Sequence, residues 1–188
     1  NEETPAAFSS YEALYAEYLN QLRIFLSGLA QAGIGGRGTF DETGKWIWKR
    51  KIPCSVISLL EEGCIENARS YLESGTRYSV LSPHMGGAAD TANSLYAIKK
   101  LVFEDGRISL SALLQAVKTD WKDAEPLRAY IRNKLTYYGN DGEGGADEVM
   151  AQLLNDFARI TEEFNGKTPV IFTAGVSTFG RQIEWRGV

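Results

Sequence analysis

Cys64 and Glu66 place a thiol and a carboxylate two residues apart, in the sequence Gly-Cys-Ile-Glu at 63–66. A carboxylate beside a reactive sulfur could take a proton from a substrate, so this pair is the first candidate for catalysis. The surrounding apolar residues, however, recur as on one face of a helix, which we predict to run from Pro53 to Ala68. On such a helix the two side chains point about 200° apart. We therefore interpret Cys64 as a packed structural thiol.

The other residues that could do chemistry do not form a recognisable set. His84 is the only histidine, and with Cys54 and Cys64 it makes no convincing zinc site. We interpret it as a loop histidine with a backbone partner rather than a pH switch or an acid–base group. Asn140 and Asp141 have the chemistry of a turn. Three nearby acids could hold Ca²⁺ or Mg²⁺ but match no EF-hand spacing, so we interpret them as favourable charges at a helix start: Glu143, Asp147 and Glu148. The sequence thus predicts no catalytic, cofactor-binding or metal-binding residue.

Residues 33–51 combine a glycine-rich stretch with two tryptophans. Four of the six residues 33–38 are glycine, yet the strand, helix and Lys-Ser/Thr pair of a phosphate loop are absent, so we expect a flexible loop. The Thr43-Gly44 pair suits a tight turn, and Trp46 and Trp48 alternate with charged residues, which indicates a short hairpin. Tryptophan beside lysine also suits single-stranded nucleic acid, but the acidic chain around it argues against that partner.

Five further segments carry the apolar spacing of helices. The clearest lies at 90–103, capped by Asp90 or Thr91 and stopped by Gly106, with Lys99 and Lys100 off its apolar face. That face is formed by Ala88, Ala92, Leu95, Ile98 and Val102. The other four are expected at 11–32, 108–117 (capped by Ser109), 127–135 and 146–164.

Strands are few in this pattern. A short strand is expected at 78–81, followed by an irregular approach to the next helix at 82–87. The continuous apolar run at 168–178 is the best strand candidate and suits a buried position. The fold class is therefore α/β and helix-dominated, and residues 1–188 are expected to form a single domain in which 33–51 is a glycine-rich loop with a hairpin insert.

Composition narrows the partners and the compartment. The chain has 188 residues, 44% of them hydrophobic, and a formal net charge of −4, which argues against nucleic acid or an anionic membrane as a partner. No apolar run approaches the roughly 20 residues that span a bilayer. The N-terminus lacks the features of a signal peptide and an initiator Met, so we expect a cytoplasmic protein with reduced thiols, cut or processed at this end.

The order of three segments identifies a resemblance. These are PCSVISLLEEGCIENARSYLESGTRY at 53–78, SLYAIKKLVF at 94–103 and YYGNDGEGGADEVM at 137–150. In this order they resemble the C-terminal part of the glycyl radical enzymes, the relatives of pyruvate formate-lyase. The resemblance implies a segment of an α/β barrel that encloses a radical site, with this chain supplying outer helices and one or a few strands. It also implies that the insert at 33–51 departs from the family, whose members generally continue a helix there.

The resemblance further implies that this chain is inactive alone. The Gly-Cys-Ile-Glu at 63–66 falls in a later part of the family than the catalytic cysteine, and Gly187 lies in Trp-Arg-Gly-Val rather than in the Arg-Val-Ser/Ala-Gly-Tyr loop of the radical glycine. The intact relative would be a lyase, dehydratase or formate acetyltransferase-like enzyme of anaerobic metabolism. Its glycyl radical would be installed by a radical-SAM activating enzyme, and its partners would be the remainder of the enzyme chain or a homo-oligomer. The alternative is an independent, non-catalytic helical domain that binds a partner or a subunit.

The strand at 168–178 adds one expectation about association. In the family such strands lie between barrel neighbours, and an unpaired apolar strand offers free amides and carbonyls to another copy. We therefore predict that the isolated chain self-associates through residues 170–174.

Overall fold

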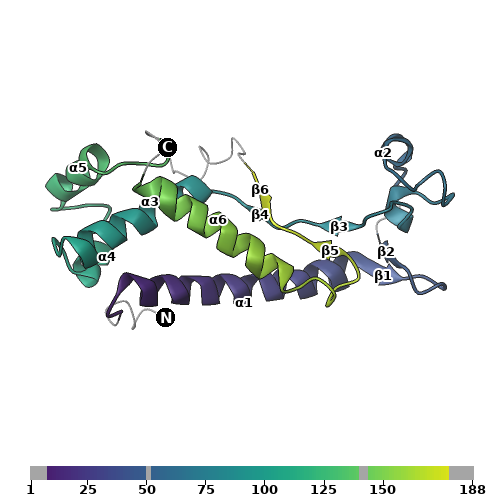
Figure 1. The fold of residues 1–188 in the computed structure, drawn as a ribbon, viewed down its shortest axis with the longest axis horizontal. Helices are drawn as coiled ribbons and strands as arrows, with labels where there is room; N and C mark the ends of the chain where they lie inside the picture. Colours follow the sequence, from purple (N-terminus) through teal and green to yellow (C-terminus); the bar gives the residue numbers. More distant parts are fainter. Residues whose placement is uncertain (1–7, 50–51, 140–143, 178–188) are drawn as a thin grey trace. The chain divides into compact units, whose positions relative to one another are not determined.

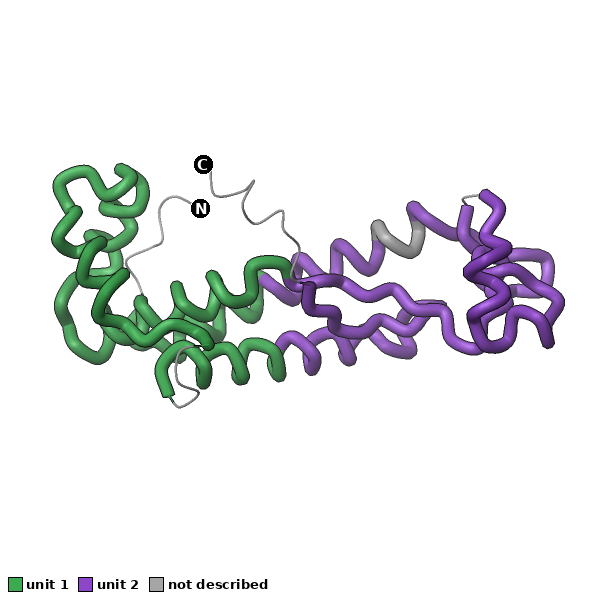
Figure 2. Tube along the Cα trace, turned by 90° about the horizontal axis from the view of Figure 1, so that it is seen from above, with its two compact units in different colours: residues 1–21, 86–156, 178–188 green, residues 22–85, 157–177 purple. Residues whose placement is uncertain are grey.

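The computed structural model describes residues 8–49, 52–139 and 144–177, and all structural statements below concern these residues. They form two compact units, each assembled from separate parts of the sequence (Figure 2). Of the described residues, unit 1 comprises those within 1–21 and 86–156, and unit 2 comprises those within 22–85 and 157–177. Because neither unit is one continuous stretch, the single domain expected over 1–188 stays a prediction.

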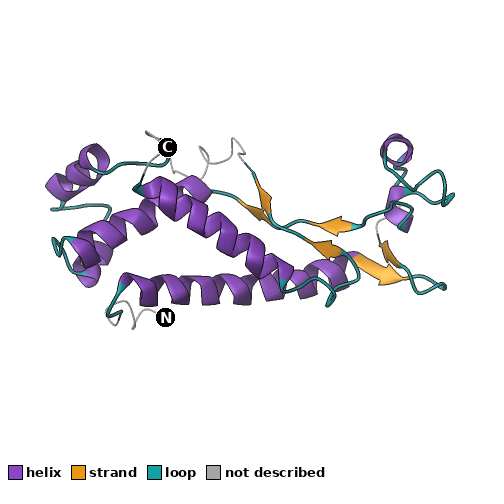
Figure 3. Cartoon of the chain, in the orientation of Figure 1, coloured by secondary structure: helices purple, strands orange, loops and turns teal. Residues whose placement is uncertain are grey.

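Helices dominate both units, as the sequence predicts (Figures 1 and 3). In chain order the helical elements are α1 (Tyr11–Arg37), α2 (Ser55–Leu60), the 3₁₀ turn η1 (Tyr71–Glu73), α3 (Ala88–Ile98), the π-helical segment η2 (Lys99–Glu104), α4 (Leu110–Lys118), α5 (Glu125–Lys134) and α6 (Ala146–Glu162). No described helix is both long enough and apolar enough to cross a bilayer.

The strands are short and pair in twos, all within unit 2. β1 (Gly38–Phe40) and β2 (Trp46–Trp48) form an antiparallel hairpin, with Thr39 opposite Ile47. β3 (Val80–Leu81) lies parallel to β5 (Ile171–Phe172), and β4 (His84–Met85) lies parallel to β6 (Gly175–Val176) (Figure 3). Each described strand therefore has hydrogen bonds to one neighbour only.

The helix α3 and its continuation η2 hold unit 1 together, but not along the one face that we predicted. Ala88, Ala92 and Leu95 are buried as expected, whereas Ile98 and Val102 are only half-buried. Leu101 is fully buried instead. The reason is the π-helical turn that begins at Lys99, because its wider i→i+5 hydrogen bonding changes which residues point inward.

The prediction for the start of this helix is wrong, and the prediction for its end is confirmed. No side chain caps α3: Gly87 is the N-cap residue with a φ of +70°, and the Thr91 hydroxyl donates to the Gly87 carbonyl at 3.0 Å instead. The predicted caps at Asp90 or Thr91 are therefore wrong. The predicted stop is confirmed, because η2 ends at Glu104 and Gly106 takes a φ of +58°.

A second packed cluster joins η2 to α5 within unit 1. Ala97, Leu101 and Leu135 form its buried centre, surrounded by half-buried side chains that include Ile108 and Tyr130. The Arg107 guanidinium lies 4.3 Å from the centre of the Tyr130 ring, which closes the edge of the cluster. The Ser109 hydroxyl accepts a hydrogen bond from the Ala112 amide at 3.2 Å, so the predicted N-cap of α4 is confirmed.

The glycine-rich stretch belongs to a helix, contrary to expectation. The predicted end of the first helix near Ala32 is wrong, because α1 continues to Arg37. Glycine allows φ values of both signs, so it permits a loop without requiring one, and here the preceding long helix is simply extended. The loop expected at 33–38 is therefore absent from the described chain.

The predicted hairpin is confirmed and packs through its tryptophans. The rings of Trp46 and Trp48 meet edge to face, with centres 4.8 Å apart. Gly38 opposes Trp48 in the register, and a Cβ atom built on Gly38 would collide with the Trp46 ring. The turn is held by Asp41, whose carboxylate accepts hydrogen bonds from the amides of Thr43 and Lys45 at 2.9 Å each.

The prediction of a helix from Pro53 to Ala68 is wrong for more than half of these residues. The helical part is α2 alone, and residues 61–68 form turns. The cause is Gly63, whose φ is +97° and whose missing Cβ would stand 2.8 Å from the Arg77 amide nitrogen. Only glycine allows this close approach, which lets the Arg77 amide donate to the Glu62 carbonyl at 2.7 Å.

The apolar run at 168–178 forms two short strands rather than one, and Thr178 lies outside the described residues. Val170 and Phe172 are buried, as a buried strand requires, but Ile171 and Val176 are exposed. The expected strand at 78–81 is confirmed over Val80–Leu81, whereas the irregular segment expected at 82–87 contains β4.

Candidate functional site

Cys64 is buried in a turn of unit 2, and its surroundings do not favour a reactive sulfur. Its side chain is 4% exposed, and burial raises the pKa of the thiol, with Glu61 and Glu66 adding to that effect. A raised pKa means less thiolate, which is the nucleophilic form. Glu66 is exposed. The two side chains therefore lie in different environments, and the interpretation of Cys64 as a packed structural thiol is supported, although the segment is a turn and not a helix.

Cys54 differs from Cys64 in its accessibility. Both thiols are free, as predicted, but Cys54 is only half-buried and lines the clefts on both sides of α2. Cys54 is the N-cap residue of α2 and therefore lies just before the helix.

His84 lies in β4 rather than in a loop, which corrects our interpretation. Its ring occupies the space beside Gly175, where an added Cβ would stand 2.6 Å from a ring carbon. Ser82 Oγ would also lie 2.6 Å from that Cβ. The histidine is thus packed across the parallel pair of β4 and β6, and the glycine is required there for steric reasons.

The acidic residues near the start of α6 do not assemble a metal site among the described residues. Asp147 accepts a hydrogen bond from the Gly139 amide at 3.0 Å, which ties the preceding loop to the first turn of the helix. Glu148 is exposed. Asn140, Asp141 and Glu143 lie outside the described residues. Across 8–49, 52–139 and 144–177, no three His, Cys, Asp or Glu side chains are grouped as metal ligands would be.

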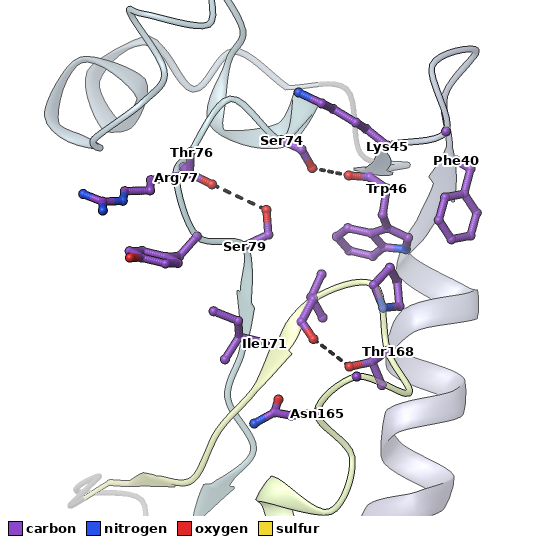
Figure 4. Close-up of a pocket in the computed structure, with 15 residues that line it drawn as sticks. Phe40, Lys45, Trp46, Ser74, Thr76, Arg77, Ser79, Asn165, Thr168 and Ile171 are labelled. Atoms are coloured by element: carbon purple, nitrogen blue, oxygen red, sulfur yellow. Dashed lines mark hydrogen bonds between the residues drawn. The ribbon is translucent and has the colours of Figure 1, made fainter.

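A cavity of about 770 Å³ in unit 2 is lined by several polar side chains (Figure 4). It lies where the hairpin, the segment 74–79 and the segment 165–171 meet. Lys45, Trp46 and Phe40 come from the hairpin side, and Asn165 and Ile171 come from the opposite side (Figure 4). Sequence reasoning did not find this cavity, because its walls come from three segments far apart in the chain.

The polar groups of the cavity are mostly engaged within the chain itself. The Thr168 hydroxyl donates to the Val170 carbonyl at 2.6 Å, and the Asn165 carboxamide oxygen accepts from the Phe172 amide at 2.7 Å. The Ser74 hydroxyl donates to the Trp46 carbonyl (Figure 4). Arg77 pairs with Glu62 at 2.7 Å.

These contacts build the walls of the cavity but supply no chemistry. The residues that line it include neither cysteine nor histidine nor a carboxylate.

Comparison with known proteins identifies the family of this chain. Residues 1–185 match the family described as pyruvate formate lyase-like. The chain belongs to this family. The resemblance to glycyl radical enzymes inferred from the sequence is thereby confirmed.

The relatives are dehydratases and lyases. The chain is 29% identical to trans-4-hydroxy-L-proline dehydratase of Clostridioides difficile over 153 residues, which cover 81% of this chain and 18% of the relative. It is 36% identical to (2S)-3-sulfopropanediol dehydratase of Klebsiella oxytoca over 108 residues, which cover 57% of this chain and 13% of the relative.

Solved structures agree with these relationships. The hydroxyproline dehydratase of Clostridioides difficile superposes with a TM-score of 0.65 and 26% identity, over 92% of this chain and 20% of that chain. A structure from Roseburia inulinivorans, described for 1,2-propanediol dehydration, superposes with a TM-score of 0.67 and 27% identity, over 91% and 21%. This member of the pyruvate formate lyase-like family thus spans about a fifth of the length of the structures it matches.

Proposed function

We propose that this chain is a scaffold segment of a longer glycyl radical lyase, dehydratase or acyltransferase, and that it has no activity alone. The observation that carries the proposal is the family match over residues 1–185, combined with a coverage of only 18% of trans-4-hydroxy-L-proline dehydratase. A segment of that size supplies structure and surface to an enzyme whose catalytic groups lie elsewhere in the polypeptide.

The parallel strands support a place in a barrel wall. Parallel strands need crossover connections and neighbours on both sides, and they are normally buried on both faces. β5 and β6 each pair with a single described strand, and Ile171 and Val176 beside that pairing are exposed. In the intact enzyme, further strands would continue the sheet from these open edges, and α1 and α6 would form part of the outer layer.

The chemistry of the intact enzyme would come from outside this chain. Among the described residues, the free thiols are Cys54, half-buried, and Cys64, buried with a raised pKa. The glycyl radical would lie elsewhere in the longer cytoplasmic polypeptide, and a separate radical-SAM activating enzyme would install it. Which diol, amino acid or sulfonate that polypeptide uses would be chosen by residues outside this segment.

The test compares this chain with the polypeptide encoded by its whole gene. Both are incubated anaerobically with S-adenosylmethionine and a reduced activating enzyme, and electron paramagnetic resonance is recorded. We expect the doublet of a glycyl radical in the whole polypeptide and none in the 188-residue chain. The matched control replaces the glycine of the radical loop by alanine in the whole polypeptide, which should abolish the doublet.

Two results would overturn the proposal. A doublet on the 188-residue chain would show that the radical site lies within it. A gene that encodes only these residues would favour the alternative, an independent non-catalytic domain that binds a partner through the same surfaces.

A further inference from the structure

The helix α2 is amphipathic, but its apolar side faces away from its own unit. With 100° between successive residues, Val56, Ile57, Leu59 and Leu60 lie within an arc of about 160°, and Ser58 lies opposite its centre. Helices on a protein surface normally turn such an apolar arc inward.

Contacts within unit 2 show which side of α2 faces inward. Ser58 Oγ accepts a hydrogen bond from the Tyr71 amide at 3.0 Å and donates one to the Cys54 carbonyl at 2.7 Å. The apolar side chains point away: Leu60 is 83% exposed, Val56 72% and Leu59 67%. The polar side of the helix therefore faces its own unit, and the apolar side faces outward.

Neighbouring residues extend this surface on both sides of the helix. One cleft of about 780 Å³ lies against Trp48, Ile52, Cys54 and Ile57. Another of about 460 Å³ lies against Ile52, Cys54, Leu59 and Ile65. We call the surface formed by Ile52, Val56, Ile57, Leu59, Leu60 and Ile65 the α2 face. All six side chains are exposed, although contiguous apolar surface of this kind normally marks an interaction site.

We propose that the α2 face is an internal contact of the intact enzyme, covered by an apolar segment of the same polypeptide that lies outside these residues. The inference rests on the proposed function, which supplies a longer chain. This chain covers 20% of the hydroxyproline dehydratase structure that it resembles, so about four-fifths of such a polypeptide is available as the covering segment.

Two physical arguments favour the same polypeptide over a second copy. A covalently linked segment reaches its site at an effective concentration in the millimolar range, whereas a second copy must be recruited from dilute solution. The surface is also ridged, with a helix standing between two clefts, so that it suits side chains that interdigitate from several directions as in a domain core. The covering segment is therefore apolar where it meets the six side chains of the α2 face.

Cys54 reports on this contact, because it lines both clefts and is half-buried in the isolated chain. Native protein is labelled with a maleimide, without activation, and the modified cysteine is identified by peptide mass spectrometry. Cys64, which also lines the smaller cleft but is buried already in the 188-residue chain, gives the background rate in every sample. We expect Cys54 to react readily in the 188-residue chain at every protein concentration, and at least tenfold more slowly in the whole polypeptide.

A pair of variants of the whole polypeptide ties that protection to the α2 face. Leu60→Asp should raise the Cys54 rate towards that of the 188-residue chain, because a carboxylate on the face opposes burial. Val117→Asp changes an exposed side chain of unit 1 and should leave the rate unchanged. Comparing the unaltered polypeptide with the 188-residue chain tests the inference even where Leu60→Asp fails to fold.

Three results would overturn the inference. The first is an equal Cys54 rate in the chain and in the whole polypeptide, which would leave the proposed function standing if the radical doublet still forms. The second is protection of Cys54 in the 188-residue chain that grows with concentration, because that would identify a second copy as the occupant. The third is a Leu60→Asp polypeptide that folds and keeps Cys54 protected.

Discussion

The two units of this chain differ in how completely they bury their apolar side chains. Among the described residues, fifteen large apolar or aromatic side chains are exposed, and thirteen of them belong to unit 2. In unit 1 the exceptions are Val117 and Tyr138. The helices of unit 1 bury Leu101 and Leu153 completely, whereas α2 in unit 2 buries none of its residues.

The units differ in how many of their apolar side chains are covered by other parts of the chain. Unit 1 has helices on more than one side of α3 and η2, so that its apolar residues meet partners from the same chain. Unit 2 has a core of its own around Leu26, Phe157, Ile160 and Phe172, but α2 contributes no buried residue to it. The exposed apolar side chains are thus concentrated in one of the two units, and α2 accounts for four of them.

The largest expected difference in stability is between two leucine-to-alanine substitutions, one in each unit. Leu101→Ala removes a fully buried side chain from the cluster between η2 and α5 and should lower the free energy of unfolding by about 2–5 kcal/mol. Leu60→Ala removes an exposed side chain from α2 and should change it by less than about 0.5 kcal/mol in the isolated chain. Urea unfolding followed by circular dichroism measures both. Equal losses would contradict the difference between the units.

The sequence predicted the elements of unit 1 better than those of unit 2, for a physical reason. The stop at Gly106 and the cap at Ser109 depend on neighbours within a few residues, so the local sequence contains the signal. The turn at Gly63 depends on the amide of Arg77, and β5 depends on β3 some ninety residues away. Such contacts leave no periodic pattern.

The same limit applies to the candidate site. The interpretation of Cys64 as a packed structural thiol could be argued from its apolar neighbours, and its burial agrees with that interpretation. The cavity in Figure 4 could not be predicted, because its hairpin wall and Asn165 lie about 120 residues apart in sequence. The α2 face was also missed: its apolar spacing was correctly noted, but the spacing alone indicates amphipathicity and not the direction in which the helix faces.

A second contrast concerns glycines with positive φ. Gly63→Ala places a Cβ 2.8 Å from the Arg77 amide nitrogen at a φ of +97°, and should destabilise unit 2 by about 2 kcal/mol or more. Gly106→Ala in unit 1, where nothing lies within 4 Å of the added Cβ, should cost roughly 1–2 kcal/mol from the backbone conformation alone. Hydrogen exchange localises each effect. A smaller loss for Gly63→Ala than for Gly106→Ala would contradict the close approach of residues 63 and 77.

The two cysteines test how far the core of unit 2 extends. Cys64→Ser places a hydroxyl in a buried position and should lower stability by about 1–3 kcal/mol, because a buried hydroxyl without a partner has lost its hydration. Cys54→Ser, at a half-buried position beside two clefts, is the matched control and should have little effect. Thermal unfolding of the two variants checks this order. Equal stability of both variants would mean that Cys64 is no more enclosed than Cys54.

The contact between α1 and α6 in unit 1 should depend on pH at its alkaline end. The Tyr15 hydroxyl donates to Asp156 at 2.9 Å, and burial, followed by this bond, raises the pKa of Tyr15 above its usual value of 10. Because the neutral phenol is favoured in the folded state, its contribution is complete below pH 10 and is lost as the pH rises further. Tyr15→Phe should cost about 1 kcal/mol at neutral pH and weaken the alkaline loss of stability. An unchanged alkaline profile in urea unfolding would count against this role.

The smallest effect is expected in unit 2, between α1 and Glu163, which directly follows the end of α6. Arg23 and Glu163 form an ion pair at 2.9 Å, and the hydrogen bonds from the Arg23 guanidinium lower the pKa of Glu163. A lowered carboxylate pKa adds stability above the ordinary value near 4.5, and that stability is lost as the pH falls below it. Both side chains are about two-fifths exposed, so water and salt screen the pair. Arg23→Ala should therefore cost no more than about 1 kcal/mol, and less at high salt. Urea unfolding at low and high salt measures it, with Tyr15→Phe as the salt-insensitive counterpart. A loss for Arg23→Ala that exceeded that of Tyr15→Phe and persisted in salt would mean that the packing of α1 on α6 in unit 2 depends on this pair.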